Sequence, residues 1–258
     1  MINRFFQEGE KLDVAGLNRI IVLLDRSETE LTEIGLNEWR SGLTGPPHKH
    51  DLKEQVFYIT SGVGIIKLGD QSFEAKRGSL AYIPAGVVHQ SITTGNEPLC
   101  YMLFNVFSDS SKEGHASFAD HIEKVKETRK QQAESVKADT ADSPVTFEIK
   151  PGNFFNDVHE LENKVSDSVS KEYLLKSSET NRCEMELVTL HDEIEIPAIS
   201  HKTKEQSFFV THGKGRITID DEMEDIKPGD LLFIPRNSAY SVKAVGNELV
   251  YLCLSAIV

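Results

Sequence analysis

The chain has 258 residues, of which 39% are hydrophobic and 27% charged, a balance typical of globular proteins rather than disordered or fibrous ones. Lysine and arginine total 28 against 41 aspartate and glutamate residues, so the net charge is −13. Such a charge repels phosphate backbones and anionic lipids, which argues against nucleic-acid and membrane partners. It does not exclude an anionic small molecule, because a bound dication would dominate the electrostatics of its own pocket.

Targeting signals and disulfides are not expected. The sequence contains no apolar run near the roughly 20 residues that span a bilayer, and its start lacks the pattern of a secretion signal. Its cysteines, Cys100, Cys183 and Cys253, are odd in number and far apart, which disfavours a disulfide framework. We therefore predict a cytoplasmic protein.

Residues from about 16 to 107 form short runs rich in β-branched and aromatic side chains, such as residues 19–24, 64–68 and 100–104. Turns that contain glycine separate these runs. Short strands with a turn every 8–12 residues or so are typical of a sandwich or barrel. This part of the chain is therefore predicted to be all-β.

A polar segment follows. In residues 117–137, Phe118, Ile122 and Val125 recur at helical spacing, and Ser117 followed by Asp120 resembles a capping box. The second half of this segment is almost wholly polar. The pattern predicts a linker helix that packs against a β domain by its first two turns.

An internal repeat relates the two ends of the chain. Adding 151 to the residue number carries residues 27–29 onto 178–180, residues 53–55 onto 204–206, and residues 95–97 onto 246–248 without a gap. So many identities at one offset indicate a duplicated β unit. We predict an N-terminal domain at 1–108, a helical linker at 109–144 and a C-terminal domain at 145–258.

Both halves resemble the cupin superfamily, and the duplication resembles a bicupin. The residues that match the two cupin motifs are Gly42, His48, His50 and Gly62 for the first, and Gly78, Pro84, Gly86 and His89 for the second. Thr93 departs from the second motif, which has asparagine there. The resemblance implies an all-β fold of two tandem jelly-roll (double-stranded β-helix) barrels joined by a polar, partly helical linker.

The resemblance also implies a metal site. In cupins two histidines and an acid of the first motif and the histidine of the second hold the ion. His48 and His50 are two apart, so on a strand their imidazoles share a face and can converge on one ion. Imidazole suits divalent transition metals, and zinc, nickel, manganese and iron all remain compatible.

Gln55 stands where the motif has its acid, in a register that Tyr58 supports. The predicted ligands are therefore His48, His50, Gln55 and His89. The neighbouring Glu54 should face outward on a strand, although a shift after His50 would make it the ligand instead.

The second half departs further from the motifs. Ile199, His201, Gln206, Asn237 and Tyr240 occupy the corresponding positions. One imidazole, one amide and one phenol make a poor metal site, so we predict a second barrel without metal and with a structural role. Histidines outside the motifs, His115, His121, His159, His191 and His212, are expected at the surface or behind the ligands.

A shell of three histidines and a glutamine is neutral, which would leave a dication its full charge and make it a strong Lewis acid. The set is similar to that of cupins that open unsaturated uronates. General acid–base chemistry needs a further titratable group. Candidates are Glu38, Arg40, Tyr82 and Tyr101, of which Tyr82 and Tyr101 are equally well explained as packing residues and Arg40 as a surface charge.

Three functions follow as hypotheses. The first is a metal-dependent isomerase, lyase or ring-opening enzyme acting on a small anionic metabolite such as a sugar acid. The second is a cupin dioxygenase, and the third is a non-catalytic binding or sensing protein. In each case the partner is a small molecule and the protein is a monomer or a homodimer.

Overall fold

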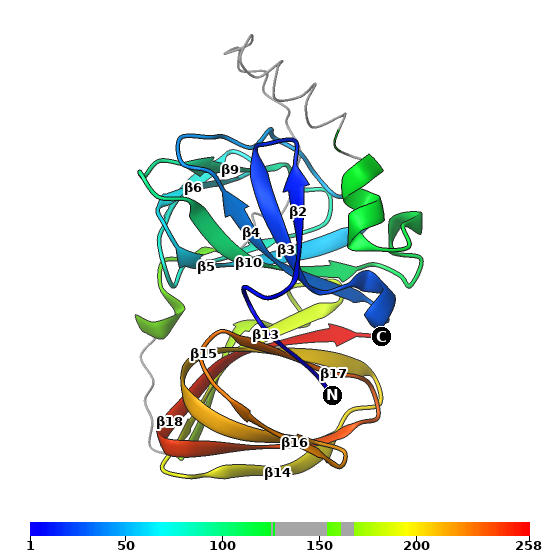
Figure 1. The fold of residues 1–258 in the computed structure, drawn as a ribbon, viewed down its shortest axis with the longest axis vertical. Coiled ribbons are helices and arrows are strands. Elements are labelled where there is room, and N and C mark those ends of the chain that lie inside the picture. Colours follow the sequence, from blue (N-terminus) through cyan, green and yellow to red (C-terminus); the bar gives the residue numbers. More distant parts are fainter. Residues whose placement is uncertain (125, 127–153, 161–167) are drawn as a thin grey trace.

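The computed structural model describes residues 1–124, 126, 154–160 and 168–258. Two similar halves lie one above the other, and each consists of antiparallel strands in packed layers (Figure 1). The arrangement is that of two tandem jelly rolls, which confirms the predicted all-β fold. In the described residues the sheets remain open at their ends.

The first half contributes nine strands of its own. They are β2 (Glu10–Val14), β3 (Asn18–Leu24), β4 (Thr32–Trp39), β5 (Lys53–Ser61), β6 (Gly64–Leu68), β7 (Gln71–Ala75), β8 (Leu80–Ile83), β9 (His89–Thr93) and β10 (Leu99–Phe107). With β11 (Phe154–Phe155), the larger sheet runs in the order β11-β8-β5-β10-β4-β3-β2. The smaller sheet runs in the order β7-β6-β9.

The second half repeats this plan. Its strands are β12 (Val169–Leu175), β13 (Cys183–His191), β14 (Glu195–Ser200), β15 (Lys204–Ile219), β16 (Glu222–Ile226), β17 (Asp230–Ile234) and β18 (Ala239–Ile257). Here β15 runs through the range that corresponds to both β5 and β6, so the two layers form one continuous sheet.

The two halves exchange their leading strands. β1 (Ile2–Phe5) pairs with β17 of the second half, with Asn3 opposite Leu232. In return β11 pairs with β8 of the first half, with Phe154 opposite Ala81. Both pairs are related by the same offset of 151. The predicted domain limits of 1–108 and 145–258 remain a prediction, and these two strands cross them.

Alternation along β5 explains how one strand serves two purposes. Successive side chains of a strand point to opposite faces, and nearly all of β5 is buried. Phe57 lies in the core inside the first half, whereas Tyr58 belongs to the core shared by the two halves. There its ring lies 5.9 Å, centroid to centroid, from that of Phe209, its counterpart in the repeat.

A helix covers one side of the first half at residues 118–124. Ser117 Oγ accepts a hydrogen bond of 3.0 Å from the Asp120 N–H and so begins the helix. Phe118 and Ile122 are buried in the first-half core, as the helical spacing predicts. Val125 and the remainder of the predicted helix lie outside the described residues. Within the described ranges there are also short 3-10 helices, η1 (Arg26–Glu28), η2 (Lys112–Gly114) and η3 (Val158–Glu160).

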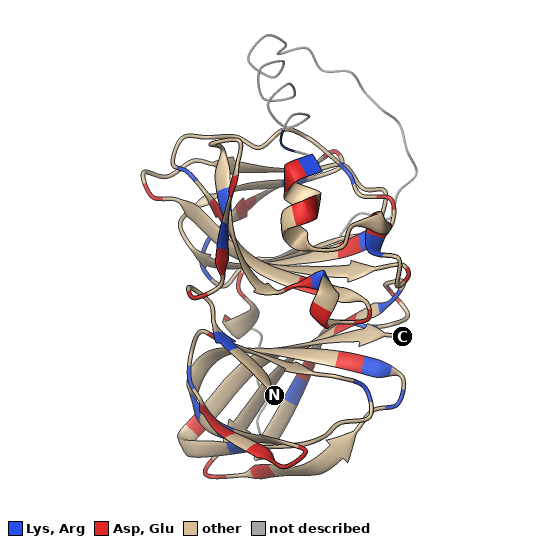
Figure 2. Cartoon of the chain, turned by 45° about the vertical axis from the view of Figure 1, so that its right-hand side comes forward, with Lys and Arg blue, Asp and Glu red and all other residues tan. Residues whose placement is uncertain are grey.

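Charged residues of both signs are interspersed over both halves in the view of Figure 2. In the part of the chain that the structure describes, no helix is both long and apolar enough to cross a bilayer. All three cysteines carry free thiols.

Candidate metal centre

His48, His50 and His89 lie together inside the first half. Their ring centroids are 4.2 Å apart for His48 and His89, 5.1 Å for His48 and His50, and 5.6 Å for His50 and His89. One ring nitrogen from each lies within 4.8 Å of the others. Two imidazole nitrogens on one zinc ion are at most about 4.2 Å apart. Small rotations of the rings therefore suffice to bring all three nitrogens onto one ion.

The backbone around His48 explains this proximity. The His48 N–H donates to the His89 carbonyl at 3.0 Å, and the His89 N–H donates to the His48 carbonyl at 2.8 Å. Such a reciprocal pair places both side chains on one face. Gly86 has φ of +82°, and its N–H donates to the His50 carbonyl at 2.7 Å, so the turn before His89 also fixes His50.

The prediction that His48 and His50 lie in a regular strand is wrong. This segment is extended but pairs at isolated bridges, Thr44 with Ile92 and His48 with His89. In the second half Ile199, the counterpart of His48, lies in strand β14, and His201, the counterpart of His50, follows the last residue of that strand. Alternation over two residues still brings the imidazoles to the same side.

Two imidazoles are oriented by the chain itself. Nδ1 of His48 lies 3.0 Å from the Pro46 carbonyl oxygen, and Nδ1 of His89 lies 3.2 Å from that of Val87. A carbonyl oxygen only accepts hydrogen bonds, so Nδ1 of each ring donates and Nε2 keeps its lone pair. This is the usual second contact of a metal-binding histidine.

Gln55 is oriented by a chain of buried hydrogen bonds. Arg26 Nε donates to Glu33 Oε2 at 2.5 Å, Asn105 Nδ2 donates to Glu33 Oε1 at 2.8 Å, and Gln55 Nε2 donates to Asn105 Oδ1 at 2.8 Å. Because a carboxylate only accepts, it fixes the direction of Asn105, and Asn105 fixes that of Gln55. The amide oxygen of Gln55 must therefore face away from Asn105.

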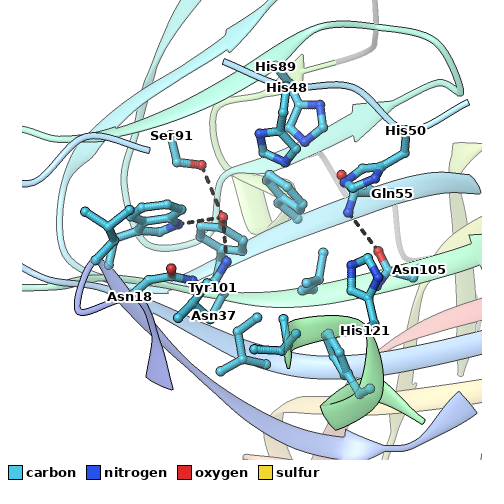
Figure 3. Close-up of a pocket in the computed structure, with 18 of the residues that line it drawn as sticks. Asn18, Asn37, His48, His50, Gln55, His89, Ser91, Tyr101, Asn105 and His121 are labelled. Atoms are coloured by element: carbon cyan, nitrogen blue, oxygen red, sulfur yellow. Dashed lines mark hydrogen bonds between the residues drawn. The ribbon is translucent and has the colours of Figure 1, made fainter. Parts of the chain in front are cut away.

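That oxygen is buried, has no hydrogen-bond partner among the described residues, and lies on the side of His50 (Figure 3). An unpaired buried acceptor costs about 1–3 kcal/mol, and a cation at the histidines would satisfy it. Three imidazoles and one amide oxygen thus fit a divalent transition metal ion.

Glu54 points away from the histidines, as predicted, but it does not reach solvent. The prediction that it faces outward is therefore wrong, because the second half covers this face of β5. It is 2% exposed, and its carboxylate accepts hydrogen bonds from the N–H groups of Asn181 at 2.8 Å and Arg182 at 3.0 Å. The Tyr82 hydroxyl also donates to it. Burial raises the pKa of Tyr82 far above its usual range. Both side chains belong to the contact between the halves.

The histidines open into a cavity of about 70 Å³. Apolar walls come from residues such as Phe57, Leu103, Phe118 and Ile122. Of the acid–base candidates, Tyr101 lines the cavity. Arg40 instead pairs with Asp13 on the surface, and Glu38 pairs with Arg19.

Six polar lining residues were not predicted: Asn18, Asn37, Lys53, Ser91, Asn105 and His121. His121 lies on the helix between Phe118 and Ile122, so helical spacing from those two apolar residues could have indicated its side. Lys53 precedes Gln55 by two and shares its face of β5. Lys53 is 2% exposed and pairs with Glu113 at 3.2 Å, and burial lowers its pKa.

The second half lacks this geometry. Ile199 pairs with Tyr240 where His48 pairs with His89. Gln206 Nε2 donates to Ser255 Oγ at 2.9 Å. Among the described residues, a cluster of three or more potential metal ligands occurs at His48, His50 and His89 and at no second place.

Comparison with known proteins agrees with the fold. Bacillus subtilis oxalate decarboxylase matches with a TM-score of 0.68 at 17% identity, over 98% of this chain and 76% of that one. A structure of the same enzyme used to study its Mn(II) centres gives a TM-score of 0.69 at 17% identity over the same shares.

Two curated relatives share shorter segments. Uncharacterized protein MJ1618 of Methanocaldococcus jannaschii is 40% identical over 52 residues, which are 20% of this chain and 42% of that protein. Uncharacterized protein SCO3923 of Streptomyces coelicolor is 33% identical over 57 residues, or 22% of this chain and 53% of that protein. The chain spans about half the length of these relatives.

The cupin domain model matches residues 38–105 and again residues 186–256, which together make up more than half of the chain. Each match falls in one half of the repeat, and the first contains the three clustered histidines. The chain therefore belongs to the cupin family, as a tandem bicupin whose second half lacks the histidine cluster of the first.

Proposed function

We propose that this bicupin is a metal-dependent enzyme that acts by non-redox chemistry on a small anionic metabolite such as a sugar acid. His48, His50, His89 and Gln55 hold one divalent transition metal ion. The observation that carries the proposal is the buried Gln55 oxygen, which faces three clustered imidazoles and has no hydrogen-bond partner among the described residues.

The chemistry follows from the charge of the donors. All four are neutral, so a bound dication would keep its full charge and polarise a carbonyl, hydroxyl or carboxylate group as a Lewis acid. Lys53 and His121 line the same cavity and supply titratable groups for proton transfer. Isomerisation, elimination or ring opening needs these two elements together.

The comparison proteins support a metal ion and a small anionic ligand. Oxalate decarboxylase, a structural neighbour, is named for a small carboxylate substrate, and its Mn(II) centres have been studied. We propose that the protein works in the cytoplasm as a monomer or homodimer.

Elemental analysis of the protein purified without chelator tests the metal site. We expect about one divalent ion per chain, lost in the double variant His48→Ala, His89→Ala and retained in His201→Ala, the matched change in the second half. An ion content that does not fall in the double variant would contradict the proposal.

Activity is tested with unsaturated uronates and related keto acids in the absence of oxygen. Turnover that depends on metal and not on oxygen supports the proposed enzyme. Turnover that stops without oxygen would indicate a dioxygenase. Calorimetric binding of such acids without product formation would indicate a binding or sensing protein.

A further inference from the structure

The cavity of the first half has two chemically different ends. The three histidines and the Gln55 oxygen occupy one side (Figure 3). A cluster of neutral polar side chains from β3, β4, β9 and β10 lies on another side, and it consists of Asn18, Asn37, Trp39, Ser91 and Tyr101.

Hydrogen bonds join this polar cluster into one network. Trp39 Nε1 and Asn37 Nδ2 both donate to the Tyr101 hydroxyl, at 2.9 and 3.0 Å. Asn18 Nδ2 donates to Asn37 Oδ1 at 2.6 Å, and the hydroxyl groups of Ser91 and Tyr101 lie 3.1 Å apart. The Tyr101 hydroxyl is thereby committed to its neighbours.

The network ends at Asn18 with an atom that has no partner. Asn18 is 3% exposed and lines the cavity, and its Oδ1 makes no hydrogen bond to any described residue. Reversing the amides of both Asn18 and Asn37 would leave an N–H of Asn18 unpaired instead. In either case a buried neutral polar group remains for a ligand to satisfy.

Charge distinguishes this end from the other. Apart from the histidines, the described residues that line the cavity include one charged side chain, that of Lys53. It precedes Gln55 by two residues on the same strand and is paired with Glu113. The Asn18 end thus offers neither a cation for a second carboxylate nor an anion for an ammonium group, and burying either charge there would be costly.

We propose that the ligand of this site is a small hydroxy acid, with its acidic group at the histidines and a neutral hydroxyl on Asn18. This inference rests on the proposed metal-dependent function. A hydroxyl both donates and accepts, so it satisfies Asn18 in either orientation of the amide. An alkyl group would leave Asn18 unpaired, and a dicarboxylate would place an unpaired charge beside it.

Calorimetry on the zinc-loaded protein tests the proposal. The probes are unbranched acids with a hydroxyl on the last carbon, from glycolate to 5-hydroxypentanoate. Each is compared with the alkanoic and the dicarboxylic acid of the same chain length. We expect the hydroxy acid of the best length to bind about tenfold more tightly than either, as one buried hydrogen bond contributes.

Two variants locate the effect at Asn18. Asn18→Leu, which keeps the shape, should bind hydroxy acid and alkanoate equally. Asn18→Asp introduces an anion and should shift the preference toward the acid that carries an amino group in place of the hydroxyl. This gain of binding tests the site even if the leucine variant does not fold.

The outcomes separate the two proposals. If no carboxylate binds in a metal-dependent way, the proposed function itself fails. If metal-dependent binding is present but wild-type protein does not distinguish hydroxy acid from alkanoate, or Asn18→Asp does not change the preference, the assignment of Asn18 is overturned and the metal site stands.

Discussion

Glu54 and Glu205 occupy corresponding positions in the two halves, and each binds the backbone of the opposite half. Glu54 accepts from the N–H groups of Asn181 and Arg182, at 2.8 and 3.0 Å. Glu205 accepts from those of Glu30 and Leu31, both at 2.8 Å. The two contacts are related by the repeat offset of 151, so the halves meet as an approximately twofold pair, like subunits of a symmetric dimer.

These reciprocal contacts should stabilise the fold. Glu54→Gln or Glu205→Gln replaces one acceptor oxygen with a donor that faces a backbone N–H group. Each change should lower the free energy of unfolding by about 1–3 kcal/mol in urea denaturation. Glu74→Gln, on the exposed side of β7, is the matched control and should stay within about 0.5 kcal/mol of wild type. Equal stability of all three variants would show that the contacts of Glu54 and Glu205 do not hold the halves together.

Glu33 should control metal affinity without contacting the ion. In Glu33→Gln the new amide can donate to Asn105, which allows Asn105 and Gln55 to reverse and present an N–H to the histidines. Affinity for zinc or cobalt, measured by competition with a chromogenic chelator, should fall about 10- to 100-fold, as for other residues behind metal ligands. Glu184→Gln, at the same position of the second half, should leave the affinity unchanged. An unchanged affinity in Glu33→Gln would show that Glu33 does not orient the amide oxygen of Gln55.

His159 should make stability depend on pH near neutrality. Burial lowers its pKa below 6.5, with smaller effects from Asp157, His212 and Arg77, and its Nε2 lies 3.0 Å from the Tyr58 hydroxyl. Between the lowered folded pKa and 6.5 the unfolded chain binds more protons than the folded one, so stability falls as pH falls through this window. Above 6.5 the contribution is fully present.

His159→Gln removes the titration and keeps a polar side chain. The free energy of unfolding of wild type, relative to that of the variant, should therefore fall as the pH is lowered from about 7.5 to 5. Denaturation series at several pH values measure it. A difference that is constant with pH would mean that His159 does not titrate across folding.

The helix at residues 118–124 should depend on its buried face. Phe118→Ala removes a ring that is 2% exposed and lines the cavity, and should cost about 3 kcal/mol or more. Glu123→Ala, on the exposed face, is the control. Hydrogen exchange should show faster exchange of residues 118–124 in the Phe118 variant. Unaltered exchange there would show that the helix is held by other contacts.

The sequence predicted the fold through two features that need no long-range information: the repeat and the two motifs. It also predicted the cluster of His48, His50 and His89, because alternation and motif spacing determine which side chains converge. It could not place Glu54, since alternation says which face a side chain takes but not whether another domain covers that face.

The polar end of the cavity was missed for a similar reason. Asn18, Asn37 and Ser91 come from β3, β4 and β9, of which β9 is distant in sequence from the other two, and each alone is an ordinary polar residue of a β protein. Only the sheet register brings them together. The exchange of β1 and β11 was equally invisible, because short strands at the start of each half carry no signal of which sheet they join.

The exchanged strands bear on how the protein can be divided. If the chain is cut between its halves, β8 and β17 each lose a neighbour, and their unsatisfied backbone groups become open edges that recruit other chains. Either piece expressed by itself should therefore self-associate or aggregate. Co-expression of both pieces should instead give a complex of the two that does not aggregate.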